Sequence, residues 1–150
     1  MKVVLDTNVP ISAFLFEKQP GKIVKFIQQG VVTPCFIVST FQELQNVLAY
    51  EKFAPVFITA KTTASQIVEN IQNKSVISDD PEIIPDVIPD KNPDNYILAA
   101  AVAGDVKFIV TGDKVLLGLK KFQRAHFKTY ANTPVVRQSP IGVEDGFIGR

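Results

Sequence analysis

Four acidic residues have the type and placement needed to bind a divalent cation. Asp6 and Asp113 each follow a short apolar run rich in β-branched residues. Glu43 and Asp94 each lie in the first turns of an expected helix. A divalent ion bound by carboxylates lowers the pKa of a bound water and neutralises charge that develops on a phosphate. If the four acids converge, they favour hydrolysis of a phosphodiester.

The scarcity of histidine and cysteine narrows the chemistry further. His126 and Cys35 are the only residues of their types, which excludes a histidine-rich metal site, a Cys-rich zinc site and an internal disulfide. Any metal would be bound by carboxylates, and this favours magnesium or manganese. We expect Cys35 in the core, because free cysteine is among the most buried residue types.

Each acid also has a purely structural explanation. Asp94 and Glu43 could complement the positive end of a helix dipole, and Asp113 could be a turn residue or an N-cap. Asp6 is the hardest to explain in this way, because Asn8 is the better-placed cap for the helix that follows. A phosphotransfer or receiver-like α/β domain, which also gathers acids at one edge of a sheet, is the alternative on the residues alone.

The expected elements alternate between strands and helices. Strands are expected near residues 3–5, 31–38, 76–77, 107–110 and 126–129. Helices are expected near residues 9–15, 23–30, 39–48, 55–71, 93–104 and 114–119. This order predicts a parallel sheet with helices on both faces, with ligands bound where the carboxyl ends of the strands meet. The proline-rich residues 78–93 are expected to form a surface loop, with Ile83-Ile84 and Val87-Ile88 tucked down.

Length and composition indicate one ordinary globular domain. The chain has 150 residues, of which 46% are hydrophobic and 21% charged, as in an average globular protein. No segment approaches the ~20 apolar residues of a membrane helix. No signal peptide is visible, because only a few apolar residues separate Lys2 from Asp6. We therefore expect a cytoplasmic protein with no membrane partner.

The net charge of +1 is unevenly distributed. Residues 1–106 have a net charge of −4 and residues 107–150 a net charge of +5. The cations from residue 107 to residue 128 are Lys107, Lys114, Lys120, Lys121, Arg124 and Lys128. Such a patch could attract a polyanion, although a solvated helix face has the same composition.

Four segments together resemble the PIN-domain ribonucleases. They are V-V-L-D-T-N-V-P-I-S-A (3–13), F-Q-E-L-Q-N-V-L (41–48), P-D-N-Y-I-L-A-A-A (93–101) and F-I-V-T-G-D-K-V-L-L (108–117). Their order and distances are specific in combination, and the resemblance covers roughly residues 1–130. It is closest to the toxin components of toxin–antitoxin pairs. Residues 131–150 resemble nothing recognised, and we expect a C-terminal tail that is extended or disordered.

The resemblance implies a three-layer α/β/α sandwich around a central parallel sheet in a domain of residues 1–130. It also implies Mg²⁺- or Mn²⁺-dependent cleavage of single-stranded RNA by hydroxide attack on a phosphodiester. By position, the catalytic and metal-binding acids would be Asp6, Glu43, Asp94 and Asp113. The polar residues that support them would be Asn8, Ser12 and Thr111. Further candidates, for contacts with the RNA backbone, are Lys114, Lys120, Lys121 and Arg124.

The third acid departs from the family's pattern. Relatives commonly have a compact D-P-x-D-N, whereas residues 90–95 here read D-K-N-P-D-N. Since the pair Asp94-Asn95 directly opens a helix, we assign the third acid to Asp94 and keep Asp90 as a reserve.

A toxin would have an antitoxin protein as its partner, and we also expect a homodimer. The alternative is an inactive PIN-like domain that binds RNA or protein without cutting. Four mutually repelling acids argue against that alternative, because a binding module does not need them.

Overall fold

The computed structural model describes residues 1–15 and 21–129, with the side chains of residues 12–15, 21 and 22 left out. One sheet has the strand order β3-β2-β1-β4-β6-β5. Its strands are β1 (Lys2–Leu5), β2 (Thr33–Ile37), β3 (Val76–Ser78), β4 (Phe108–Val110), β5 (Lys121–Phe122) and β6 (Ala125–Lys128). β5 pairs with β6 in antiparallel fashion, and the other pairs are parallel. The predicted parallel sheet is therefore confirmed.

The helices alternate with the parallel strands, as predicted. In the described ranges they are α1 (Asn8–Leu15), α2 (Gly21–Gln28), α3 (Val38–Leu48), the 3₁₀ turn η1 (Glu51–Phe53), α4 (Ala54–Thr59), α5 (Ala64–Asn73), α6 (Asn95–Gly104) and α7 (Lys114–Gly118). No helix among these residues is long and apolar enough to cross a membrane.

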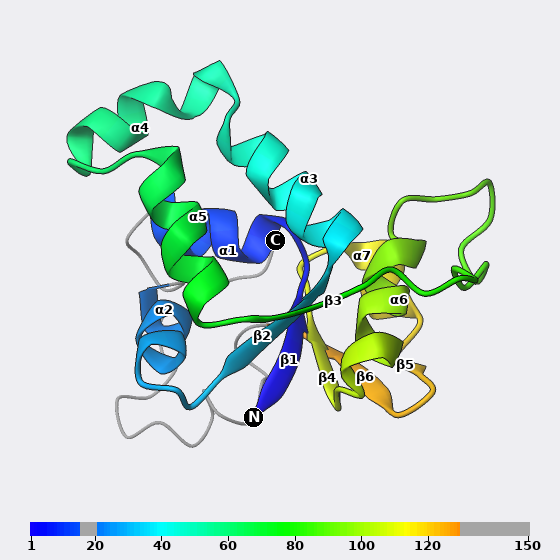
Figure 1. Cartoon of the computed structure of the whole chain (residues 1–150). Coiled ribbons are helices and arrows are strands. Elements are labelled where there is room, and N and C mark those ends of the chain that lie inside the picture. Colours follow the sequence, from blue (N-terminus) through cyan, green and yellow to red (C-terminus); the bar gives the residue numbers. More distant parts are fainter. Residues whose placement is uncertain (16–20, 130–150) are drawn as a thin grey trace.

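Helices cover both faces of the sheet, which confirms the three-layer α/β/α architecture (Figure 1). Val3 of β1 packs with the α2 residues Ile23 and Ile27 on one face. Its neighbour Val4 packs with Leu98 of α6 on the other face. Successive strand residues point to opposite faces, so a single strand contributes to both hydrophobic layers.

Close packing at Gly104 fixes α6 against the sheet. A Cβ at this position would lie 3.0 Å from the Cβ of Cys35 in β2 and 3.1 Å from the Cγ1 of Val106. Cys35 is buried, as predicted. The α6 segment contains no charged residue and is largely buried. Its N-terminus, where Asp94 lies, is therefore held at a defined place beside the sheet.

The prediction of one helix over residues 55–71 is wrong, because α4 and α5 are separate helices. Lys61 between them has a φ of 54°. The Thr63 hydroxyl accepts a hydrogen bond from the Gln66 backbone N–H, and the Gln66 side chain accepts one from the Thr63 N–H, both at 3.1 Å. This reciprocal capping box starts a new helix. The apolar periodicity continues across the break and hides it.

The connection from β3 to α6 is irregular, as predicted, and only part of it packs inward. Ile88 is buried and Ile84 half-buried, whereas Ile83 is 82% exposed and Val87 is 43% exposed. The strand β5 was not predicted, since two residues are too few to form a pattern. The predicted tail, residues 131–150, lies outside the described residues.

Candidate functional site

Asp6 lies where β1 ends and α1 is about to begin. Its backbone N–H donates to the Val110 carbonyl at 2.9 Å, and its own carbonyl accepts from the Val9 N–H at 2.8 Å. The carboxylate is 8% exposed, and its Oδ2 accepts a hydrogen bond from the Thr111 hydroxyl at 2.7 Å. The end of the central strand therefore holds a nearly buried acid.

Thr111 and Asp113 follow the neighbouring strand β4 and link it to this acid. The Thr111 hydroxyl also accepts a hydrogen bond from the Asp113 backbone N–H at 2.9 Å. The Oδ1 of Asp113 accepts from the N–H groups of Val115 and Leu116, so Asp113 is the N-cap of α7. Asp113 thus has the N-cap role that its sequence position allowed, and it lies at the same edge of the sheet as Asp6.

Glu43 reaches the same edge from α3. Its Oε2 accepts a hydrogen bond from the Thr7 hydroxyl at 2.9 Å. At the start of α3 it is the Thr40 hydroxyl that bonds to the backbone of Ile37. The carboxylate of Asp80 accepts from the Ser39 N–H and hydroxyl instead. The first turn of α3 thus has hydrogen-bond partners other than Glu43.

Asp94 precedes α6 without capping it by its side chain. A hydrogen bond from its backbone N–H to the Asn92 side chain, at 2.8 Å, holds the turn before the helix. Asp94 is half-buried, whereas the reserve candidate Asp90 is exposed, with a φ of 64°. Asp94 lies close enough to Asp6, Asp113 and Glu43 for their charges to act on it.

The four carboxyl groups interact electrostatically. The pKa of Asp94 is raised to about 6, mainly by burial and additionally by the negative charges of Asp6, Asp113 and Glu43. Burial also raises the pKa of Asp6, partly offset by hydrogen bonds from Thr111 and the Thr7 backbone. Asp113 and Glu43 add to the increase at Asp6. Four separate segments of the chain thus bring negative charge to one edge of the sheet.

The donor set suits a hard divalent cation. It is made of carboxylate oxygens, and the one ion pair described among residues 1–15 and 21–129 joins Arg124 to Asp105, away from the acids. Mg²⁺ or Mn²⁺ would bind such oxygen ligands and would relieve the repulsion between the carboxylates. Within the described part of the chain, however, no three His, Cys, Asp or Glu side chains form a group ready to hold a metal ion.

Of the three polar residues predicted to support the acids, the described part of the structure shows only Thr111 in contact with one of them. Thr111 contacts Asp6 directly, whereas Asn8 is the exposed first residue of α1. The side chain of Ser12 lies outside the described residues.

The four candidate RNA-binding cations are divided between two ends of the sheet. Lys114 follows Asp113 at the acidic edge. Arg124 lies in the turn before β6, at the opposite end, 3.6 Å from Asp105. Lys120 and Lys121 lie at the start of the β5–β6 hairpin.

Sequence reasoning did not identify the roles of Thr7 and Asn95. Thr7 is 8% exposed and donates to Glu43. The side chain of Asn95, 3% exposed, accepts hydrogen bonds from the N–H groups of Val87 and Ile88 and donates to the Ile88 carbonyl. Both residues adjoin a predicted acid in the sequence, which is the signal that could have singled them out.

Comparison with known families agrees with this geometry. A family model described as the PIN domain matches residues 2–115. The curated proteins and the solved structures compared with the chain gave no significant match. The matched segment contains β1, β4 and all four acids. The chain therefore belongs to the PIN-domain family.

Proposed function

We propose that this protein is a metal-dependent endoribonuclease that cleaves single-stranded RNA. PIN domains are typically nucleases and generally use divalent metals, so family membership supports hydrolase chemistry. The observation that supports this function most is the set of acids at one edge, where Asp6, Asp113 and Glu43 all raise the pKa of Asp94. Such repulsion is unfavourable in a domain that binds no cation.

In this proposal the four acids hold one or two Mg²⁺ or Mn²⁺ ions. The bound metal would supply positive charge against the scissile phosphate and lower the pKa of water. Thr111 fixes one oxygen of Asp6 and orients the carboxylate. Thr7 does the same for Glu43. These hydroxyls limit the freedom of the acids, so that less ordering is needed when a cation and a phosphate bind.

The direct test measures cleavage of a fluorescently labelled single-stranded RNA by the purified chain. Cleavage should require Mg²⁺ or Mn²⁺, stop with EDTA, and leave a 5′-phosphate and a 3′-hydroxyl. A duplex of the same sequence is the matched substrate control and should be cut more slowly. Metal-independent cleavage, or none with either ion across a set of RNA sequences, would contradict the proposal.

The toxin role extends this proposal to a partner protein. It predicts a small antitoxin that binds the chain and suppresses cleavage. Expression of the chain alone should slow growth of the host cell, and co-expression of the antitoxin should restore it. Growth arrest that persists in an Asp6→Asn variant would separate toxicity from RNA cleavage. A homodimer is also proposed, and light scattering of the purified chain tests it.

A second candidate function is an inactive PIN domain that binds RNA or a partner without cutting. It is favoured by the lack of a ready three-ligand metal group among the described residues. Titration calorimetry with Mn²⁺ separates the two functions. Binding of Mn²⁺ that is lost in Asp6→Asn favours the nuclease, whereas no heat with the wild type favours the inactive binder.

A further inference from the structure

A strip of basic side chains crosses the β5–β6 half of the sheet. Ala125 and Phe127 of β6 are buried in the layer beneath α6. Because side chains alternate along a strand, His126 and Lys128 must point to the opposite face. Lys121 of β5 pairs directly with His126 and lies on the same face. We call Lys121, His126 and Lys128 the basic strip.

The basic strip is accessible and has no described acidic partner. Lys121 and His126 are exposed and Lys128 is half-buried. The described helices on this face pack on other strands, since α2 contacts Val3 of β1 and Val110 of β4. In the described part of the chain, no ion pair joins the strip to a carboxylate. Within the described part of the chain, Lys121 and Lys128 are therefore available to an external anion.

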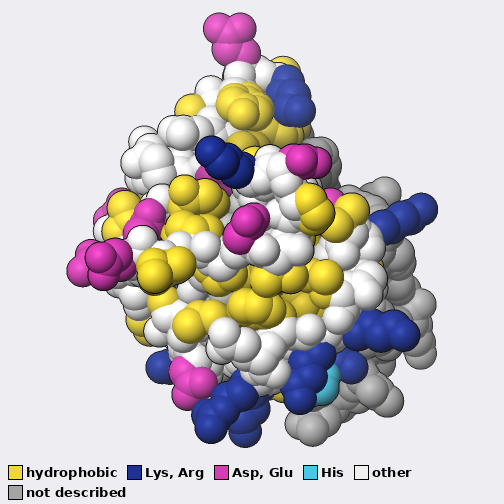
Figure 2. All heavy atoms as spheres, turned by 90° about the vertical axis from the view of Figure 1, so that its right-hand side faces the viewer, with side chains coloured by type: hydrophobic (Ala, Val, Ile, Leu, Met, Phe, Trp, Pro, Cys, Tyr) yellow, Lys and Arg dark blue, Asp and Glu magenta, His cyan; other side chains and the backbone are white. Residues whose placement is uncertain are grey.

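Basic side chains are concentrated at one end of the face that Figure 2 shows. Figure 2 shows Lys and Arg side chains gathered along the lower rim with the histidine among them, while most Asp and Glu side chains lie higher. The acids described above stand at the carboxyl ends of the parallel strands, and the Asp105–Arg124 pair stands at the opposite end. A polyanion would be repelled by the acidic edge and attracted from the basic end.

The basic strip leads to the acidic edge. His126 and Lys128 are two residues apart on β6, about 7 Å. The Lys128 carbonyl accepts from the N–H of Thr111, whose hydroxyl binds Asp6. Lys128 pairs with Val110, and Val110 pairs with Leu5. Two strand spacings, about 10 Å, thus separate the backbone of Lys128 from the strand that ends at Asp6.

We propose that the basic strip binds the phosphate backbone of a single-stranded RNA and leads it to the acidic edge. This inference rests on the proposed function for its substrate. It assigns RNA binding to a face of the sheet. His126 and Lys128 on this face were not among the RNA-binding candidates named from the sequence. Phosphate contacts of this kind position a nucleic acid without reading its sequence.

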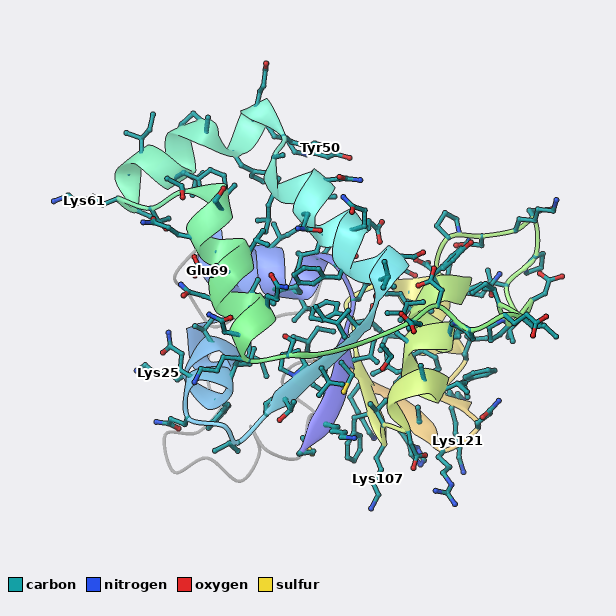
Figure 3. The ribbon with its side chains drawn as sticks, in the orientation of Figure 1. Lys25, Tyr50, Lys61, Glu69, Lys107 and Lys121 are labelled. Atoms are coloured by element: carbon teal, nitrogen blue, oxygen red, sulfur yellow. The ribbon has the colours of Figure 1, made fainter. Side chains whose placement is uncertain are left out.

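The test measures binding of a fluorescein-labelled 12-nucleotide RNA by anisotropy in EDTA, over a range of salt concentrations. The variant Lys121→Gln with Lys128→Gln should weaken binding by roughly tenfold and reduce the salt slope by about 1.4, the value for two lost single-strand phosphate contacts. The control is Lys25→Gln with Lys61→Gln, which removes the same charge. Figure 3 shows Lys25 and Lys61 on the far side of the molecule from Lys121.

The two double variants separate site-specific binding from net charge. The control should match the wild type in affinity and slope, and thermal melting should show that both variants are folded. Equal loss of affinity in the two variants, or no loss in either, would overturn the proposal. Because EDTA prevents metal-dependent cleavage, the result is independent of whether the acids catalyse hydrolysis.

Discussion

Asp6 illustrates how one residue acquires a chemical role from its surroundings. It ends the central strand, is 8% exposed, and receives the Thr111 hydroxyl. Burial raises its pKa, and the nearby Asp113 and Glu43 carboxylates raise it further. An acid in an ordinary surface turn would be solvated, so burial and neighbouring carboxylates would not raise its pKa in this way. Burial and the charges of neighbouring acids likewise raise the pKa of Asp94, to about 6.

Replacing Thr111 with valine tests the hydrogen bond that fixes Asp6. Valine has the same shape but no hydroxyl, so the Asp6 carboxylate loses its 2.7 Å donor and becomes harder to ionise. Loss of such a supporting contact typically costs about 10- to 100-fold in metal affinity or activity. The exposed Thr59→Val is the control and should keep both. A Thr111→Val variant with wild-type Mn²⁺ affinity and RNA cleavage would contradict this role.

Replacing Asp94 with asparagine tests, through its pH dependence, the burial and the neighbouring negative charges that raise the pKa of Asp94. With a pKa near 6 in the folded state and 3.8 as the ordinary value, the native protein binds more protons than the unfolded chain between these values. Stability therefore falls as pH rises through this window. Asparagine removes the effect, so the variant's gain in free energy of unfolding should be larger at pH 7.5 than at pH 5.

Urea denaturation at the two pH values measures this difference. The matched control is Asp90→Asn, at an exposed position with φ 64° that asparagine also tolerates. The control should show the smaller dependence on pH. A gain for Asp94→Asn that is the same at both pH values would mean that the pKa of Asp94 is not raised in the folded protein.

At the scale of elements, hydrophobic patterns predicted the sheet correctly. They failed where polar contacts determine where a helix begins or how a side chain is oriented. The buried runs of β1 and β4 and the helix order follow from hydrophobic periodicity. The break between α4 and α5 depends on the Thr63–Gln66 capping box, which the continuing apolar pattern hides. The hydrogen bond between Thr7 and Glu43 was not predictable in the same sense, because the two residues are 36 positions apart. Spacing placed the acids at one edge, but it could not give their orientation.

The Asn95 side chain should hold the loop before α6 in place. Its three hydrogen bonds to Val87 and Ile88 are within a region that is buried around Ile88. Asn95→Ala leaves these backbone groups without partners, at a cost of about 1–3 kcal/mol in free energy of unfolding. Hydrogen exchange at Val87 and Ile88 should become faster.

The exposed Asn73→Ala serves as the control for this loop and should change stability by no more than about 0.5 kcal/mol. If Asn95→Ala unfolds at the same urea concentration as Asn73→Ala, the amide does not secure the loop against the helix that follows Asp94.

At the scale of the whole molecule, the three layers of Figure 1 hold the ends of β1 and β4 together, and the four acids gather at that edge of the sheet. A divalent ion would relieve repulsion between residues from four segments of the chain, so its binding should stabilise the entire fold. An ion that binds only the native state adds about 2.7 kcal/mol when its concentration is 100 times Kd.

Thermal melting with added Mn²⁺ tests this linkage. The melting temperature should rise with Mn²⁺ concentration and return to its starting value with EDTA. The rise should be smaller at pH 5 than at pH 7.5, because protons compete for the carboxylates as the pH falls below about 6. A rise of equal size in Asp6→Asn would show that the ion binds elsewhere.

The central claim is that the acids at the end of β1 and β4 catalyse metal-dependent RNA cleavage. Its most direct test compares the wild type with Asp6→Asn and with Asp79→Asn, on one single-stranded RNA with saturating Mn²⁺. Asp79 is an exposed acid that is not among the charges acting on Asp6 or Asp94. The account predicts that Asp79→Asn cleaves at the wild-type rate and that Asp6→Asn loses at least about 100-fold, the upper end of the loss typical of residues that only support a metal ligand. Equal cleavage by all three proteins would contradict it.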